Sequence, residues 1–349
     1  MTSVGFDVTP MTTGVTGVAR YVRELVGALR GQGVTVSTYA FGRGRYPALP
    51  GTRHISVPLR VLHTAWAMAP WPRAETVAGD VDVVHVPDLR AAPTRRPLVM
   101  TLHDLAAVDH PELHSPRRVA AQRAQLETVR RQASVVITVS EATRTRAVAH
   151  GVSPERIVVT PLGHTPRPPV GASVIDGPYL LAVGEVTPRK NLGVLTRAFA
   201  AAKVPGLRLV VAGPTSPQTA DLLGPDRDDV IILGSVDDET LTGLYEGAVA
   251  LCFPSLAEGF GLPVLEAMSA GVPVLASDID VVREVGADAV SFAPPRDVAA
   301  WTDAIRQLAE DGELRARLSE AGRRRASLFT WEATAAATVA AYEKALAWT

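Results

Sequence analysis

Short apolar runs alternate with helix-length segments along the whole chain, and this alternation constrains the fold more than any other feature. The first half contains SVGFDV (3–8), VDVVHV (81–86), PLVMTLHD (97–104) and SVVITVS (134–140). The second half contains YLLAVG (179–184), LRLVVAG (207–213), VIILG (230–234), VALCFPS (249–255) and PVLAS (273–277). Apolar strands separated by helices are typical of parallel sheets covered on both faces. The sequence therefore predicts two doubly wound α/β domains.

A proline- and glycine-rich segment separates the two series. Residues 160–178 hold five prolines and three glycines, a composition incompatible with a helix. The 349 residues suffice for two hydrophobic cores. We predict an N-terminal Rossmann-like domain over 1–165, a linker over 166–178, a second Rossmann-like domain over 179–330, and a C-terminal helix over 331–349 that crosses back to the first domain. Ligands of such sheets bind at strand C-termini, so we expect a central cleft between the domains.

The composition is that of an ordinary globular protein, with 47% hydrophobic and 20% charged residues. The single cysteine, Cys252, excludes an intrachain disulfide, and its apolar surroundings indicate a buried strand residue rather than a catalytic thiol. The N-terminus lacks the pattern of a secretion signal, and no run approaches the ~18 apolar residues of a membrane span. We expect a soluble, cytoplasmic protein.

The two halves of the chain carry opposite charge. Residues 1–163 hold 19 Arg against 12 acidic residues, net +7, whereas residues 164–349 hold 16 basic and 24 acidic residues, net −8. Five arginines lie in the helical segment 115–131, which could contact an anionic membrane surface or a lipid diphosphate. A solvated helix face explains them equally well. Basic residues are not interleaved with aromatic ones, which argues against nucleic acid as a partner.

The segment EGFGLPVLE (258–266) places two carboxylates around a glycine-rich turn. Pro263 suits the first turn of a helix, so Glu258 lies on the loop and Glu266 on the helix. Gly259 and Gly261 let the backbone approach a ligand closely, and the helix start favours an anion such as a phosphate. We expect Glu258 to bind neutral hydroxyls beside that anion and Glu266 to bind ribose hydroxyls. An ordinary loop and surface helix would fit the physics equally well.

Residues 253–277, FPSLAEGFGLPVLEAMSAGVPVLAS, closely resemble the E-x(7)-E signature of a large family of retaining glycosyltransferases that includes bacterial mannosyltransferases and glycogen synthases. Four further segments resemble that family in the same order: TGVTGVARYVRELVGALR, LHDLAAVDHPE (102–112), SVVITVSEATR (134–144) and YLLAVGEVTPRKNLGVLTRAFA (179–200). The resemblance implies the two-Rossmann-domain fold called GT-B. It also implies an acceptor bound mainly by the first domain, a nucleotide sugar bound by the second, retention at the anomeric carbon and no metal.

Arg189 and Lys190 match the pyrophosphate-binding motif of the family. Lys190 is one of three lysines in a chain with 32 arginines, so the pair does not reflect compositional habit. Two cations after a strand can neutralise the charge that develops on a departing diphosphate. The chain departs from the family at Glu185, where many members carry an arginine. Arg189 could supply the missing contact.

His103 follows an apolar strand, and the matching histidine of the family contacts the transferred sugar. A lone histidine is more often structural, but the resemblance favours sugar binding and stabilisation of an oxocarbenium-like transition state. We expect Asp104 to orient the loop and, with Ser140 at the next strand end, to lie on the acceptor side. Gly14 and Gly17 precede a helix and could bring amides to the donor, although an ordinary turn is equally consistent.

The predicted function is that of a metal-independent, retaining hexosyltransferase. The catalytic residues are His103, Glu258, Lys190 and Arg189. The donor-binding residues are Gly14, Gly17, Gly184, Arg189, Lys190, Gly213, Val236, Glu258, Gly259, Phe260, Gly261, Leu262 and Glu266. GDP-mannose is favoured as donor, with UDP-sugars as an alternative, and no cofactor is expected. The acceptor is a glycan, a lipid-linked sugar or a small molecule. A sugar-nucleotide 2-epimerase and a non-catalytic nucleotide-sugar-binding subunit are the alternatives.

Overall fold

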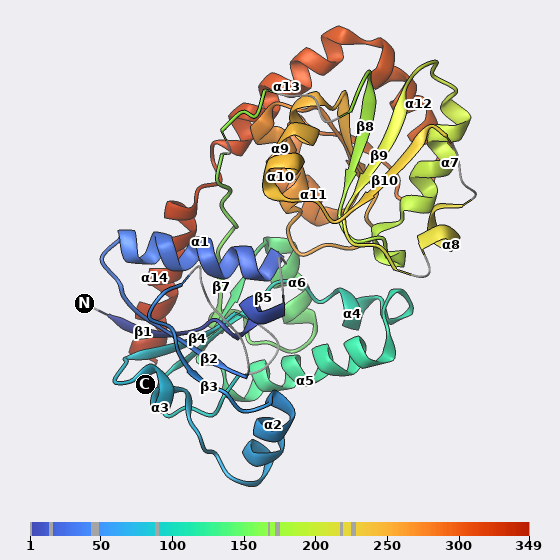
Figure 1. Ribbon diagram of the computed structural model, residues 1–349. Helices are drawn as coiled ribbons and strands as arrows, with labels where there is room; N and C mark the ends of the chain where they lie inside the picture. The colour runs from blue at the N-terminus through green and yellow to red at the C-terminus, as the bar shows by residue number, and fades with distance from the viewer. Residues whose placement is uncertain are drawn as a thin grey trace. The chain divides into compact units, whose positions relative to one another are not determined.

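The computed structural model describes residues 2–13, 17–42, 49–87, 91–166, 168–171, 175–216, 219–224 and 228–348. The chain divides into two compact units, each built around one parallel sheet (Figure 1). Unit 1 comprises Met1–Asp109, Pro116–Gly163 and Thr330–Thr349. Unit 2 comprises His110–Ser115 and His164–Phe329. The prediction of two doubly wound α/β domains is therefore confirmed.

Unit 1 has a seven-stranded sheet in the order β3-β2-β1-β4-β5-β6-β7. The strands are β1 (Ser3–Asp7), β2 (Thr35–Phe41), β3 (Arg53–Ile55), β4 (Val83–Val86), β5 (Leu98–Leu102), β6 (Val135–Thr138) and β7 (Ile157–Val159). All neighbouring strands pair in parallel. The strand order reverses between β1 and β4. Loops at the carboxyl ends of this pair therefore diverge, which is the usual position of a ligand crevice.

Helices cover both faces of the sheet in unit 1. They are α1 (Gly17–Gly31), α2 (Leu59–Met68), α3 (Ala74–Ala78), α4 (Ala106–Asp109), α5 (Pro116–Gln132), α6 (Glu141–Ala149) and α14 (Trp331–Ala347). One core joins Tyr39 and Met100 of the sheet to Val129 of α5 and Ala147 of α6. On the other face α14 packs against α1 and crosses β4 to β7. The chain passes α14 so closely at Gly163 that a Cβ there would lie 2.3 Å from the backbone nitrogen of Trp331.

Unit 2 has a six-stranded parallel sheet in the order β10-β9-β8-β11-β12-β13. The strands are β8 (Tyr179–Val183), β9 (Arg208–Ala212), β10 (Val230–Gly234), β11 (Ala250–Phe253), β12 (Val274–Ser277) and β13 (Ser291–Ala293). The helices are α7 (Leu192–Ala202), α8 (Thr219–Leu223), α9 (Asp238–Gly247), α10 (Leu262–Ala270), α11 (Asp280–Gly286), α12 (Val298–Glu310) and α13 (Gly312–Ala326). Short 3-10 turns span Thr9–Thr13, Pro111–Leu113, Pro154–Arg156, Pro188–Lys190 and Ala287–Ala289. The strand order reverses between β8 and β11.

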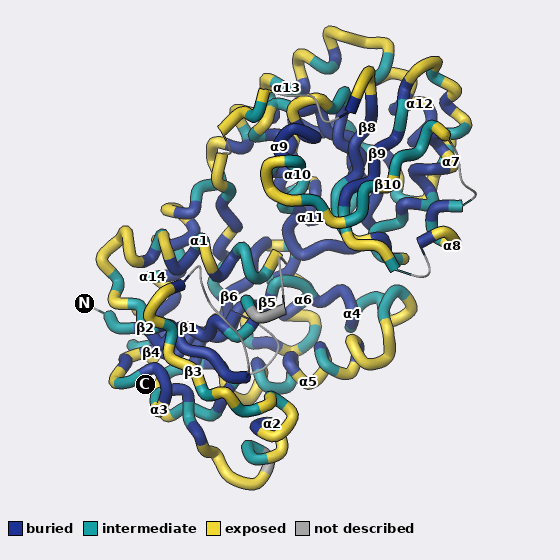
Figure 2. Tube along the Cα trace, viewed as in Figure 1, coloured by how far each residue is buried: buried dark blue, intermediate teal, exposed yellow. Residues whose placement is uncertain are grey.

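Burial follows this layering in both units. Figure 2 shows the central strands of both sheets buried along most of their length and the outer helix faces exposed, whereas the edge strands β3 and β10 are more exposed. Cys252 is buried in the core of unit 2 beside Leu180 and Leu275, as its apolar surroundings predict. Burial also raises the pKa of its thiol to about 12, so the side chain is inert.

Two segments of unit 2 are held by acidic side chains. Asp311 ends α12, and its side chain accepts a hydrogen bond from the Leu314 amide at the start of α13. Residues 164–178 belong to unit 2. There the amides of Val170 and Gly171 donate to the Glu246 carboxylate of α9, at 3.0 and 3.1 Å. Val170 and Gly171 of the predicted linker are thus hydrogen-bonded to α9.

Candidate active site

Two oppositely charged side chains meet at the point where the strand order of unit 2 reverses. Lys190 lies in the 3-10 turn after β8, and Glu258 lies in the loop after β11. Lys190 Nζ donates to Glu258 Oε1 at 2.7 Å, and Arg189 Nη1 lies 2.7 Å from Glu258 Oε2. Arg189 also donates to the carbonyl oxygen of Ala257 at 2.7 Å. The structure therefore brings together three of the predicted catalytic residues.

Burial makes this cluster electrostatically strong. The Lys190 and Glu258 side chains are only 12% and 11% exposed. Burial acts to raise the pKa of Glu258, but the charges of Lys190 and Arg189 outweigh it and lower that pKa to about 2. Burial, opposed by Glu258 and assisted by Arg189, lowers the pKa of Lys190. Glu258 is thus an ionised hydrogen-bond acceptor at neutral pH, held by two cations.

Glycines keep the backbone open beside the charged cluster. Gly184 directly follows β8 and Gly213 directly follows β9, with φ angles of 135° and 154°. A Cβ on Gly213 would lie 2.1 Å from the carbonyl oxygen of Gly184, so the two turns touch backbone to backbone. A Cβ on Gly184 would lie 3.0 Å from Cε of Lys190. A side chain at either position would displace the turn or the lysine.

Helix α10 begins at the same edge of the sheet. Its N-cap residue is Gly261, with φ 102°, which has no side chain to cap the first amides. Gly259 and Phe260 are buried, and Leu262 is half-buried at the first helical position. The Phe260 ring packs edge-on against Phe329, with centroids 5.8 Å apart. A rigid, uncapped helix start beside two cations is suited to binding an anion.

Glu266 and Val236 flank this helix start. Glu266 Oε2 accepts a hydrogen bond from the Tyr245 hydroxyl of α9 at 2.9 Å, which orients the half-buried carboxylate. Val236 is half-buried after β10, immediately before Asp237, the N-cap of α9. Glu185, at the position where the resemblance leads one to expect arginine, is exposed, and its charge acts to raise the pKa of Lys190.

His103 occupies the carboxyl end of β5 in unit 1 and is half-buried. Its Nε2 lies 3.0 Å from the carbonyl oxygen of Pro87, which follows β4. The Tyr21 ring of α1 meets the imidazole edge-on, with centroids 4.7 Å apart. The imidazole is therefore fixed from two sides, next to the strand pair at which the order of this sheet reverses.

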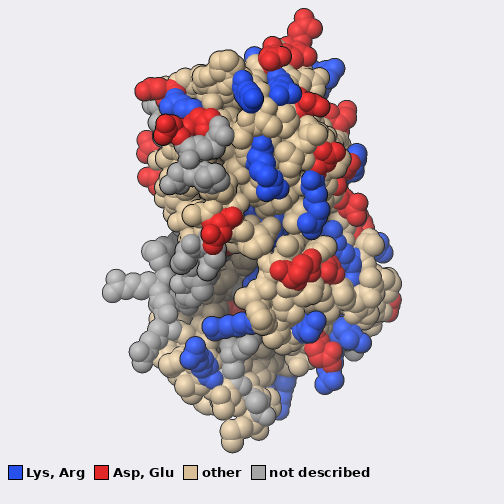
Figure 3. Space-filling view, turned by 90° about the vertical axis from the view of Figure 1, so that its right-hand side faces the viewer, with Lys and Arg blue, Asp and Glu red and all other residues tan. Residues whose placement is uncertain are grey.

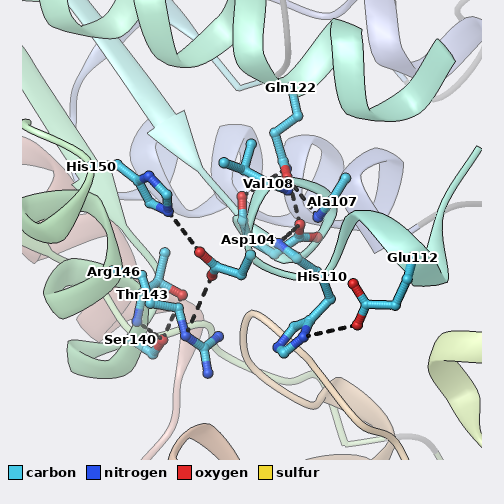
Figure 4. Close-up of polar contacts among 12 residues, drawn as sticks. Asp104, Ala107, Val108, His110, Glu112, Gln122, Ser140, Thr143, Arg146 and His150 are labelled. Atoms are coloured by element: carbon cyan, nitrogen blue, oxygen red, sulfur yellow. Dashed lines mark hydrogen bonds and ion pairs between the residues drawn. The ribbon is translucent and has the colours of Figure 1, made fainter. Parts of the chain in front are cut away.

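The loop after His103 is held by one buried side chain, Gln122 of α5 (Figure 4). Gln122 Nε2 donates to the carbonyl oxygen and to Oδ1 of Asp104, both at 3.0 Å. Gln122 Oε1 accepts from the amides of Ala107 and Val108, at 2.8 and 3.1 Å. Asp104 Oδ1 also accepts from the Ala106 amide at 3.0 Å. These contacts fit the expected role of Asp104 in orienting the loop, and its place on the acceptor side stays a prediction.

Ser140 caps a helix. It is fully buried and is the N-cap of α6, where its Oγ accepts from the Thr143 amide at 3.0 Å (Figure 4). Its expected place on the acceptor side stays a prediction. Gly17 is exposed and begins α1. Gly14 lies outside the described residues.

The arginines of α5 lie on its exposed side, which fits both alternatives. Arg117, Arg118, Arg123, Arg130 and Arg131 are exposed. Glu127 forms ion pairs with Arg130 and Arg131 on the same helix. Basic and acidic side chains are interspersed on the face shown in Figure 3. Within the described ranges no helix is long and apolar enough to cross a membrane, and no group of three or more acidic, histidine or cysteine side chains is arranged to hold a metal.

Comparison with known proteins identifies the family. Residues 15–166 match the model of Glycosyltransferase Family 4, and residues 170–325 match that of Glycosyl transferases group 1. The chain is 32% identical over 339 residues to the MMP alpha-(1->4)-mannosyltransferase of Mycolicibacterium hassiacum, covering 85% of this chain and 81% of that protein. It is 33% identical over 266 residues to O-antigen chain mannosyltransferase B of Escherichia coli, covering 70% of each. The chain belongs to the family 4, group 1 glycosyltransferases.

The fold of this glycosyltransferase is shared with solved structures. Sucrose-phosphate synthase from Thermosynechococcus elongatus superposes with a TM-score of 0.77 at 22% identity, covering 100% of both chains. The two parallel-sheet units therefore form the GT-B fold. Family membership makes the protein an enzyme.

Two residues of the glycosyltransferase site were not anticipated from the sequence. Asn191 has a left-handed backbone, with φ 51°, and its Nδ2 donates to the carbonyl oxygens of Pro254 and Pro295 at 3.1 and 2.7 Å. It thereby ties the Lys190 turn to the loop that carries Glu258. Asparagine tolerates this conformation, and its place directly after Lys190 was a usable signal. Tyr245 carries no local signal, because its partner Glu266 is 21 residues away.

Proposed function

We propose that this glycosyltransferase transfers a hexose, mannose in preference, from a nucleoside diphosphate sugar to an acceptor hydroxyl with retention of configuration. The observation that carries the proposal is the buried Lys190–Glu258–Arg189 cluster at the strand reversal of unit 2, beside the uncapped start of α10. The two mannosyltransferase relatives support mannose, and GDP-mannose is the favoured donor. A UDP-sugar is the alternative donor.

The diphosphate binds against Lys190, Arg189 and the first amides of α10. As the bond to the sugar breaks, negative charge grows on the leaving diphosphate, and fixed cations and amides stabilise it without reorganising. The charge is supplied by side chains, so the proposal invokes no metal or other cofactor. Glu266, oriented by Tyr245, binds the ribose hydroxyls. The turn at Val236 borders the base.

Glu258 binds hydroxyls of the transferred sugar and fixes the two cations. Its low pKa keeps it an acceptor throughout the reaction. The leaving diphosphate takes the proton of the incoming acceptor hydroxyl on the same face of the sugar, which retains the configuration without an enzyme nucleophile. His103 contacts the sugar and stabilises its oxocarbenium character. The acceptor is a glycan, a lipid-linked sugar or a small molecule bound by unit 1, whose exposed α5 arginines could contact an anionic membrane.

The test is transfer from GDP-mannose and UDP-glucose to a panel of mannosides, glycolipids and small-molecule acceptors, with the product configuration read by NMR. The proposal predicts GDP release that depends on an acceptor and a product with the donor's anomeric configuration. An inverted product would refute retention. Isomerised sugar nucleotide formed without any acceptor would instead indicate an epimerase. Binding of the nucleotide sugar without turnover on any acceptor would indicate a non-catalytic subunit.

A further inference from the structure

A chain of buried polar side chains crosses one face of the unit 1 sheet and ends beside His103. Tyr342 of α14 places its hydroxyl 2.7 Å from Nδ1 of His85 on β4. Nε2 of His85 lies 2.8 Å from Oγ1 of Thr101 on β5. Thr101 Oγ1 lies 3.0 Å from the hydroxyl of Tyr21 on α1. All four side chains are completely buried.

This series of hydrogen bonds is complete when the His85 imidazole is neutral. An imidazole with one N–H can donate at one ring nitrogen and accept at the other, so each of the three hydrogen bonds has one donor in either tautomer. Burial, with a smaller contribution from His103, lowers the pKa of His85 to about 3. His85 is therefore uncharged at physiological pH. It also packs against Phe6, with ring centroids 4.4 Å apart.

The end of the chain reaches His103 through an aromatic contact. Tyr21, whose hydroxyl takes part in the last hydrogen bond, also places its ring edge-on against the His103 imidazole, with centroids 4.7 Å apart. Thr101 of β5 also lies two residues before His103, which directly follows that strand. Buried polar groups are costly when unpaired, so a fully paired chain specifies one arrangement of the elements that carry it. Those elements are α14, β4, β5 and α1.

Helix α14 has anchors besides Tyr342. Thr334 Oγ1 donates to the carbonyl oxygen of Pro161 at 2.7 Å, and Nε2 of Gln32, which directly follows α1, donates to the carbonyl oxygen of Glu332 at 2.7 Å. These contacts hold the beginning of the helix without Tyr342. Removing the Tyr342 hydroxyl leaves them in place, so its main expected effect is on the alignment of His85 and its partners.

We propose that Tyr342 and His85 are positioning residues that set the orientation of the His103 imidazole through Thr101 and Tyr21. The C-terminal helix is then part of the scaffold of the catalytic site, although it touches no substrate. The expected effect of Tyr342 and His85 on catalysis rests on the proposed role of His103. Their expected effect on the orientation of the His103 imidazole does not.

The test compares Tyr342→Phe, which removes one hydroxyl of the chain, with Tyr39→Phe. Tyr39 is equally buried in unit 1, and its hydroxyl has no hydrogen-bond partner among the described residues. The ring resonances and titration of His103 are followed by NMR on histidine-labelled protein, with assignment by His103→Gln. We expect Tyr342→Phe to shift the ring resonances of His103 and its titration. It should also lower kcat about three- to tenfold, with unchanged KM for the donor, because one aligning hydrogen bond is lost. Tyr39→Phe should move neither.

Unchanged His103 resonances in a folded Tyr342→Phe protein would overturn the inference, whatever the role of His103. Moved resonances together with full activity of His103→Gln would instead sustain the positioning and refute the proposed role of His103. If Tyr342→Phe does not fold, Thr101→Val and Thr101→Ser decide the matter. The serine variant keeps the hydroxyl and should preserve the His103 resonances, whereas the valine variant should not. Identical spectra for the two would contradict the proposal.

Discussion

Lys190 Nζ and Glu258 Oε1 lie 2.7 Å apart, in the loops that follow β8 and β11, the two neighbouring strands between which the strand order of unit 2 reverses. The pair is buried, and Arg189 completes it. A buried carboxylate held by two cations is a fixed acceptor beside a fixed positive site. This arrangement provides groups for a sugar hydroxyl and for a diphosphate at adjacent positions.

Removing the Glu258 carboxylate should abolish transfer while leaving nucleotide binding in place. The sugar loses its acceptor, whereas the cations and α10 amides that face the diphosphate remain. We expect kcat for Glu258→Ala to fall by at least about 100-fold, with the Kd for the nucleoside diphosphate, measured by calorimetry, changed little. Glu310→Ala, at an exposed position at the end of α12, is the control. Unchanged turnover would remove Glu258 from the site.

The ion pair should show strong thermodynamic coupling. Lys190→Met leaves Glu258 with Arg189 alone, and Glu258→Gln leaves two adjacent buried cations, so each should lower the free energy of unfolding by roughly 1–3 kcal/mol. The double variant removes both members of the pair and leaves Arg189 as the one cation of the cluster, so it should be less destabilised than the sum of the two. Urea unfolding of the four proteins measures this cycle. Additive effects would show that the two groups do not interact.

Glu258 should make stability depend on acid pH. Its folded pKa of about 2 lies below the ordinary value of 4.5. The ionised form therefore stabilises the fold above pH 4.5, and this stabilisation of about 3 kcal/mol is lost as the pH falls from 4.5 towards 2. Glu258→Gln should flatten that part of the curve. A parallel pH dependence in the two proteins would contradict the assigned ionisation.

His85 should act over a higher pH range. Its pKa of about 3 lies below the ordinary value of 6.5. Between pH 6.5 and 3 the imidazole is therefore protonated in the unfolded chain but neutral in the folded protein. Stability should then fall with a slope approaching about 1.4 kcal/mol per pH unit down to pH 3. The measurement is urea unfolding of the parent protein and His85→Gln between pH 7 and 4. The variant should lack this slope, and equal slopes would show that His85 titrates normally.

The contact between Gly184 and Gly213 should not tolerate a side chain. Gly213→Ala places a Cβ 2.1 Å from the Gly184 carbonyl oxygen, at a φ of 154°. We expect a loss of at least about 2 kcal/mol in unfolding free energy, with weaker nucleotide binding because the Lys190 turn moves. Gly27→Ala is the matched control, since nothing lies within 4 Å of its Cβ in α1. Equal stability of the two variants would contradict the close approach.

The sequence anticipated the parts of the fold that rest on local apolar patterns. β10 has the predicted bounds, Val230–Gly234. β2, β3, β7 and β13 were not predicted. The last three have three residues each, and only pairing with a neighbouring strand makes them strands. Such short strands leave no periodic signal.

The residues of the site were predictable by type and order but not by partner. Lys190 and Glu258 are 68 residues apart, and His85 and Tyr342 are 257 apart, so only the folded sheets show that they meet. The N-cap role of Ser140 was not predicted, although a local signal existed. A serine directly before a helical run is a typical N-cap, and that role accounts for its burial.

The most direct test of the nucleotide-sugar site is a thermal-shift series with GDP, UDP, ADP and dTDP on the parent protein and on Lys190→Met. A ligand that binds only the folded state raises the melting temperature according to its concentration and Kd. We predict a clear rise with one diphosphate, GDP in preference, and a much smaller rise in Lys190→Met. No rise with any of the four, or an equal rise in Lys190→Met, would contradict the assignment of the Lys190–Glu258–Arg189 cluster as the donor site.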